Sequence, residues 1–130
     1  MSSASDENSR LPEVDRFILD EIDSVPHLEA LLLLWNSRPR QWSVDELAAL
    51  LYLPEDHTRQ VLEDLRQRSL IVLATAAYAY NPESLRDHLM PDIDRTWRRE
   101  LVRVSNMIHF KASPAVREFA RAFRFKKDKS

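Results

Sequence analysis

Apolar residues recur at helical spacing along most of the chain. From about Pro12 to Ile22 they fall on one stripe, which predicts a first helix with proline at its start. Ser24 is the expected N-cap of a second helix that runs from Val25 to about Asn36. The C-terminal half of this second helix is almost entirely apolar, so we expect it to lie at the centre of the core.

The middle of the chain predicts two helices joined by a short turn. Ser43 and Glu46 fit a capping box, in which each side chain binds the other residue's backbone N–H, and a helix to about Tyr52 follows. The next helix, Glu55 to Arg68, begins with acidic residues and ends with arginines, as the helix dipole favours. One short strand is expected around Trp42, ahead of both helices.

A small hairpin follows, because Leu70 to Ala74 and Ala77 to Asn81 are rich in β-branched and aromatic residues. Beyond it we expect a helix from near Glu83, interrupted or kinked at Pro91. A long helix is then predicted from Asp92 to about Phe110. Its apolar seam, which either covers the core or pairs with a second subunit, consists of Trp97, Leu101, Val104 and Ile108.

The two ends of the chain are polar. Residues 1–10 are expected to form a disordered tail, and a last helix is predicted to begin at Ser113 and Pro114. That helix would dock on the core or on a partner, or lie on a membrane surface. Its apolar positions are Val116, Phe119, Ala120 and Phe123, and its basic ones include Arg117, Arg121 and Arg124. The expected organisation is a tail (1–10), a core with the N-terminal helix (11–82), C-terminal helices for packing or dimerisation (83–125) and a basic tail (126–130).

Composition excludes several classes of function. The 130 residues include no cysteine and no glycine, which removes disulfides, thiolate zinc sites and glycine-rich phosphate loops. The longest apolar run, Ala30 to Trp35, has six residues, whereas a membrane span needs roughly 20. The histidines lie far apart, without helical i, i+4 spacing, at positions His27, His57, His88 and His109. We therefore expect a cytoplasmic, non-enzymatic protein without metal or cofactor.

Charge is distributed unevenly along the chain. Residues 1–94 hold 8 Lys and Arg against 18 Asp and Glu, a net charge of −10. Residues 95–130 hold 11 against 3, a net charge of +8. Either the basic part folds back on the acidic body, or it binds something acidic, such as nucleic acid, an anionic membrane face or an acidic protein. Arginines spaced by three or four residues form a basic stripe on the long helix, at Arg95, Arg98, Arg99 and Arg103.

Three segments of the chain carry a resemblance to a known family. Trp42–Ala48 matches a positioning helix, Val61–Leu65 matches a recognition helix, and Arg68–Val72 leads into a wing. In this order the chain resembles the winged helix-turn-helix superfamily, and more closely the MarR-like small bacterial regulators. The resemblance implies a mostly α fold with a small β-hairpin and with flanking N- and C-terminal helices. It also implies a homodimeric transcription regulator that inserts helix 55–68 into the major groove of double-stranded DNA.

The residues expected to contact DNA follow from the outward face of that helix. With Val61, Leu62 and Leu65 inward, Gln60 and Gln67 face the base edges. Phosphate or groove contacts are expected from Arg59, Arg66, Thr58, Arg38 and Arg40. An intrahelical pair between Arg59 and Glu63 is also predicted from its spacing.

A second function stays open because the predicted reading surface is not basic. Over Glu55 to Arg68 there are three arginines against four acidic residues, and the wing tip, Thr75 and Ala76, carries no charge. Phosphate contacts supply much of the affinity of ordinary DNA complexes. The alternative is a winged-helix module that does not bind DNA and that binds another protein through its acidic body or its basic C-terminal helices.

Overall fold

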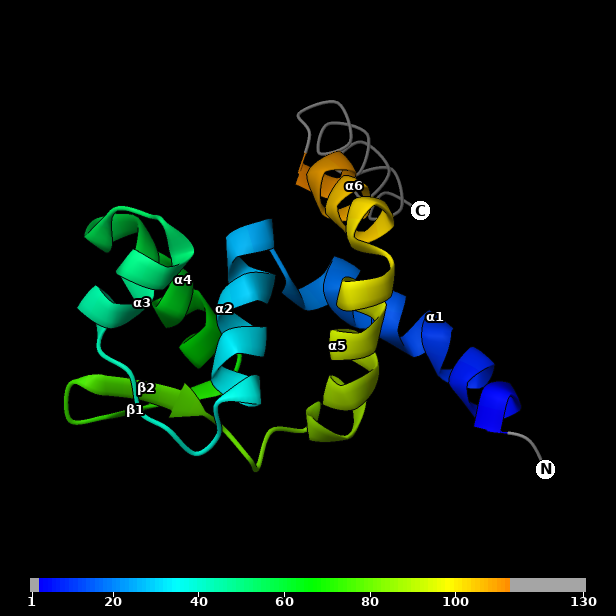
Figure 1. Ribbon diagram of the computed structural model, residues 1–130, viewed down its shortest axis with the longest axis horizontal. Coiled ribbons are helices and arrows are strands. Elements are labelled where there is room, and N and C mark those ends of the chain that lie inside the picture. The colour runs from blue at the N-terminus through cyan, green and yellow to red at the C-terminus, as the bar shows by residue number, and fades with distance from the viewer. Residues whose placement is uncertain (1–2, 113–130) are drawn as a thin grey trace, which may run out of the picture.

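The computed structural model describes residues 3–112, with side chains from Pro12 onward, and is mostly helical with one small sheet (Figure 1). The elements are α1 (Ser3–Glu21), α2 (Val25–Asn36), α3 (Val44–Leu51), α4 (Glu55–Gln67), β1 (Ile71–Ala74), β2 (Ala77–Tyr80), a 3₁₀ turn η1 (Asp87–Leu89), α5 (Met90–Arg99) and α6 (Leu101–Ala112). The predicted class of a mostly α fold with a hairpin is confirmed. None of the helices described is both long and apolar enough to span a membrane.

Helix α2 lies between two groups of elements. On one side it contacts α3, α4 and β2, and on the other side it contacts α6, which packs with α1 and α5 (Figure 1). Leu28, Leu31 and Leu34 of α2 are completely buried. The prediction that this helix lies in the core is confirmed, and its apolar character on nearly all sides reflects contact with both groups.

The segment from α3 to the hairpin agrees with the sequence pattern. The capping box is present: Glu46 N–H donates to Ser43 Oγ over 3.2 Å, and Ser43 N–H donates to Glu46 Oε1 over 2.9 Å. β1 and β2 are antiparallel, with Ile71 opposite Tyr80. The short strand expected near Trp42 is a single bridge, in which Trp42 and Tyr78 exchange backbone hydrogen bonds of 2.8 and 2.7 Å.

The N-terminal boundary differs from the prediction. Helix α1 begins at Ser3, whereas the sequence placed a disordered tail over residues 1–10 and the helix start at Pro12. Proline lacks one backbone N–H, so Pro12 removes one hydrogen bond, and no residue between Ser3 and Pro12 otherwise prevents helical backbone.

The segment before α5 also differs. No helix begins near Glu83, because Asn81 Oδ1 accepts the Glu83 N–H over 3.0 Å and so forms a local turn. Pro91 does not kink a helix. It occupies the first turn of α5, where its missing N–H leaves no partner unsatisfied.

The predicted long helix 92–110 is two helices. The break is at Glu100, whose backbone φ of −129° and ψ of 45° are not helical. Glu100 N–H ends α5 by donating to Thr96 O, and its carbonyl starts α6 by accepting Val104 N–H. The bend satisfies the backbone on both sides and lets α5 and α6 each pack on α1. The predicted last helix and basic tail lie outside the described residues.

Candidate binding surface on helix α4 and the hairpin

The side chains of α4 face the directions that helical spacing predicts. Val61, Leu62 and Leu65 are buried, while Gln60 and Gln67 are exposed. Arg59 and Arg66 are exposed on the same helix. This spacing fixes the orientation because three apolar positions on one stripe must face α2.

Thr58 is a correction to the predicted DNA-contact set. Its side chain is completely buried, and its hydroxyl donates a 3.0 Å hydrogen bond to Pro54 O. The residue therefore stabilises the first turn of α4 and is not available to a ligand.

The predicted pair of Arg59 with Glu63 is wrong. Arg59 binds Glu55 over 3.0 Å and approaches Asp56 at 3.7 Å, so its charge is directed to the N-terminal end of α4. A carboxylate four residues before an arginine has the favourable orientation on a helix. Glu63 is not free for Arg59 because it binds two other side chains, Arg66 and Tyr78.

Glu63 is the centre of a cluster that joins α4 to the hairpin. Arg66 donates to both carboxylate oxygens of Glu63, with nitrogen–oxygen distances of 2.7 to 3.1 Å. The Tyr78 hydroxyl donates to the same carboxylate over 2.6 Å. The hydrogen bond from Arg66, followed by that from Tyr78, lowers the pKa of Glu63 to about 2. Burial, and then the Glu63 carboxylate, raise the pKa of Tyr78 to about 12.

Sequence reasoning missed this cluster. Tyr78 is 15 residues from Glu63, and its pairing with Trp42 turns it toward α4. The only signal in the sequence was the aromatic content of the second strand, which predicts burial and names no partner.

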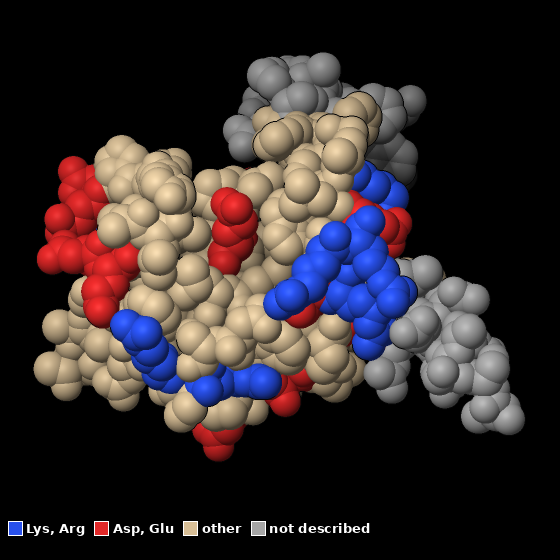
Figure 2. All heavy atoms as spheres, in the orientation of Figure 1, with Lys and Arg blue, Asp and Glu red and all other residues tan. Residues whose placement is uncertain are grey.

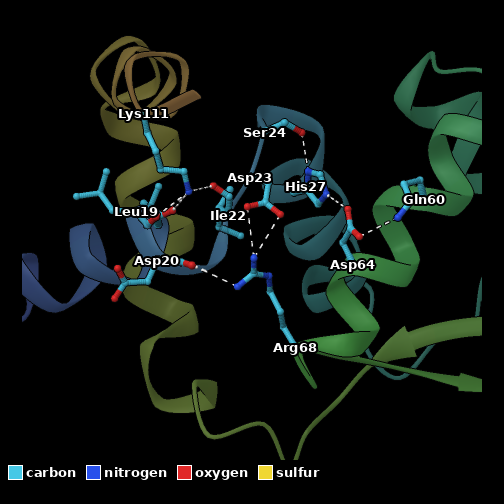
Figure 3. A network of polar contacts seen from close by, with 11 residues as sticks. Leu19, Asp20, Ile22, Asp23, Ser24, His27, Gln60, Asp64, Arg68 and Lys111 are labelled. Atoms are coloured by element: carbon cyan, nitrogen blue, oxygen red, sulfur yellow. Dashed lines mark hydrogen bonds and ion pairs between the residues drawn. The ribbon is translucent and has the colours of Figure 1, made fainter. Parts of the chain in front are cut away.

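A second polar network runs from the exposed Gln60 of α4 to the side of the helix that meets α2 (Figure 3). Gln60 donates to Asp64 over 2.9 Å, and Asp64 also accepts from the buried Nε2 of His27 over 2.9 Å. A carboxylate accepts only, so Nε2 donates to Asp64, and Nδ1 forms the second hydrogen bond of the ring with the Ser24 hydroxyl over 2.6 Å. Ser24 occupies the N-cap position as predicted, but its hydroxyl binds His27 instead of a backbone N–H.

Asp23, His27 and Asp64 are the described residues that could together hold a metal ion. Their ligand atoms lie within 4.8 Å of one another, although Asp64 is far along the sequence. Arg68 lies 3.4 Å from both carboxylate oxygens of Asp23, and it also donates to the Asp20 carbonyl (Figure 3). The site therefore already contains a cation, and both ring nitrogens of His27 have hydrogen-bond partners. The arrangement is that of a polar connection between α1, α2 and α4.

The two arginines of the loop before α3 stack on tryptophans. The Arg38 guanidinium lies 4.4 Å from the ring centre of Trp35, and that of Arg40 lies 3.6 Å from the ring centre of Trp42. Arg40 also approaches Glu46 at 3.4 Å. Both side chains are exposed, so they cover aromatic surface while their charged groups face solvent.

The predicted basic stripe is largely paired with acidic residues. Arg98 binds Asp94, and Arg103 binds both Asp15 and Glu100. Arg95 binds Asp92 over 2.9 Å. Arg99 has no partner among the residues that the structure describes. On the face in Figure 2, basic atoms gather over α5 and acidic atoms over the α3 and α4 end of the molecule.

The predicted apolar seam is divided by the break at Glu100. Val104 and Ile108 are completely buried, and Trp97 packs partly buried against the core. Leu101 is 50% exposed, because the bend turns the start of α6 out of phase with α5. A single continuous seam for dimerisation is not formed.

The hairpin adds uncharged surface beside α4. Leu73 on β1, which lies opposite Tyr78, is 42% exposed, and the tip residues Thr75 and Ala76 are exposed. Val72 is 39% exposed on the other face of the hairpin. Comparisons with family models, curated proteins and solved structures find no match for this chain.

Proposed function

We propose that this protein is a winged-helix interaction module that binds another protein through the outer face of α4 and the hairpin. The order of α2, the Trp42 bridge, α3, the short turn, α4 and the hairpin supports the winged-helix assignment. The turn between α3 and α4 contains Tyr52 in the left-handed conformation, at a φ of 56°.

The observation that carries the proposal is that the arginines of α4 are neutralised within the protein. Arg59 binds Glu55, and Arg66 forms a bidentate hydrogen-bonded ion pair with Glu63. Arg68, just after the helix, binds the end of α1. DNA affinity depends on cations that neutralise phosphates and release counterions, and these three would first have to leave carboxylates or carbonyls of the same chain.

The hairpin supports the same proposal. Leu73 is exposed, apolar and on the same face of the hairpin as Tyr78, and the tip lacks the cations with which a wing contacts phosphates. Apolar side chains bordered by polar ones are typical of protein–protein interfaces. The acidic first turn of α4, with Glu55 and Asp56, favours a partner whose facing surface is basic.

DNA is the second candidate, as the resemblance to MarR-like regulators implies. Gln67 favours it, since this exposed amide has no partner among the described residues and can both donate to and accept from base edges. Arg38 and Arg40 would supply phosphate contacts. A homodimer, which would present two such helices, stays a prediction of the same resemblance.

The first experiment separates the two candidates. Mixed-sequence duplex DNA is titrated with the protein at about 50 mM and about 200 mM salt, followed by fluorescence anisotropy. The interaction module predicts no saturable binding at either salt concentration. Binding that falls steeply with salt, and that is weakened by Arg59→Ala with Arg66→Ala, would replace the proposal with DNA recognition.

The second experiment tests the protein interface directly. A photo-crosslinking amino acid is placed at Gln67 or at Leu73, and the matched control position is Leu85, which is 89% exposed in the loop after β2. In living cells of the source organism, the first two positions are expected to yield the same discrete protein adduct and Leu85 none. Adducts to nucleic acid alone, or an identical adduct pattern at all three positions, would refute the interface.

A further inference from the structure

An open groove of about 410 Å³ lies between α2, α3 and α5 and includes no residue of α4. Its walls consist mainly of apolar side chains from these three helices, Leu32, Leu33, Leu50, Leu51 and Trp97. Along α2, the lining begins at Glu29 and ends at Asn36. Two turns of helix separate these residues, so this wall of the groove is about 10 Å long.

The apolar walls of the groove are not fully covered by the described part of the chain. Leu50 is 49% exposed, and Leu33 and Trp97 are only partly buried against the core. The run of apolar residues 30–35 gives α2 apolar side chains on nearly all sides, and the groove is where part of this surface faces solvent. Apolar surface in an open groove is stabilised when another apolar group covers it. The groove therefore favours an occupant with apolar side chains.

The two ends of the groove differ in how their carboxylates are paired. At one end, Asp94 accepts hydrogen bonds from Arg98 over 2.9 Å and from Asn36 over 3.0 Å. At the other end, Glu29 has no hydrogen-bond or ion-pair partner among the described residues. Partial burial raises the pKa of Glu29, because the apolar surroundings disfavour its charged form. A cation beside Glu29 would favour the charged form again, so the groove is complementary to an occupant that carries one.

We propose that the groove binds an amphipathic helix of another protein, with the apolar stripe of that helix on the leucines and a lysine or arginine beside Glu29. An open groove covers only one side of its occupant, and an amphipathic helix provides a second, polar side that faces water. A second copy of the groove is a poor occupant. Two identical grooves placed face to face would leave both concave surfaces unfilled and would bring two Glu29 carboxylates toward each other.

The experiment uses a single thiol in the groove, because the chain has no native cysteine and Leu50→Cys provides one. The probe is a synthetic helical peptide with leucines on one stripe, lysines beside the stripe and glutamines on the opposite side. One control peptide carries glutamate in place of lysine, and another has the same composition with the leucines distributed around the helix. The rate of reaction with a soluble disulfide reagent is measured as each peptide is added. When the probe is present at about ten times its dissociation constant, we expect the reaction to slow about tenfold.

Glu29→Gln in the same chain tests the charge, since glutamine keeps nearly the same shape. We expect it to weaken binding of the probe about threefold to fivefold, as for an ion pair that is partly open to water. Glu83→Gln is the matched control, because Glu83 is exposed in the loop after β2 and lies outside the groove. It should leave the affinity unchanged. Circular dichroism of each variant verifies that the fold is retained.

Equal protection by the probe and by either control peptide would overturn the proposal, and so would equal effects of Glu29→Gln and Glu83→Gln. A Leu50→Cys thiol that reacts much more slowly than Leu85→Cys before any peptide is added would also overturn it. Slow reaction at every protein concentration would mean that the chain covers its own groove, and slow reaction that is relieved by dilution would mean that a second copy does. The groove includes no residue of α4, so these results do not depend on the proposed function.

Discussion

The Tyr78 hydroxyl on β2 donates a 2.6 Å hydrogen bond to the Glu63 carboxylate on α4. Arg66 binds the same carboxylate through two nitrogens. One side of the candidate binding surface is therefore connected to the other by a polar cluster, and the hairpin and α4 present a single preformed surface to a partner. Preformed surfaces lose less conformational entropy on binding.

Replacing Tyr78 by phenylalanine should separate the hairpin from Glu63 while keeping the buried ring. We expect a loss of about 1 kcal/mol in the free energy of unfolding, since the acceptor is charged but partly exposed. Urea denaturation with an unchanged m-value provides the measurement. Tyr52→Phe is the control, because Tyr52 is 93% exposed. A Tyr78→Phe variant as stable as this control would contradict the structural role of the bond.

The free energy of unfolding at acidic pH should depend on Glu63. Its pKa is lowered from 4.5 to about 2, so the folded protein favours the charged form. The corresponding stabilisation is fully present above pH 4.5 and is lost as the pH falls toward 2. The stability difference between the wild type and Glu63→Gln, measured by urea denaturation at successive pH values, should shrink across that interval. A difference that stays constant from neutral pH to pH 2 would exclude this titration.

The capping box of α3 predicts a local effect. Ser43→Ala removes the acceptor of the Glu46 N–H and should cost about 1 kcal/mol of unfolding free energy. Glu46→Gln keeps an oxygen that can accept the Ser43 N–H, so its effect should be clearly smaller. Thermal unfolding followed by circular dichroism compares the two. The reverse order of stability would show that the Glu46 charge, and not the box, stabilises this helix start.

Lys111 on α6 binds the last turn of α1 (Figure 3). Its Nζ donates to the carbonyls of Leu19, over 2.7 Å, and of Ile18 and Ile22. Lys111→Met keeps the aliphatic stem but leaves these carbonyls without the cation, so we expect a loss of about 1 kcal/mol in unfolding free energy. Arg99→Met removes a cation that has no partner among the described residues and should change stability little. Equal effects in urea denaturation would indicate that only net charge matters.

Local patterns in the sequence determined α2, α3, α4 and the hairpin, because periodicity, the Ser43–Glu46 box and the turn residues act within a few positions. The outward orientation of Gln60 and Gln67 also followed from the buried stripe Val61, Leu62 and Leu65. Only the tertiary structure decided how the charges pair: Glu63 with Tyr78, Asp64 with His27, and Arg103 with Asp15.

The break at Glu100 and the start of α1 at Ser3 also needed the full structure. A continuous helix and two bent helices satisfy nearly the same local hydrogen bonds, so the sequence pattern alone does not separate them. The choice depends on packing of α5 and α6 against α1. Helical periodicity is a property of neighbouring residues, whereas the partner of a charge or the site of a bend depends on segments that meet only after folding.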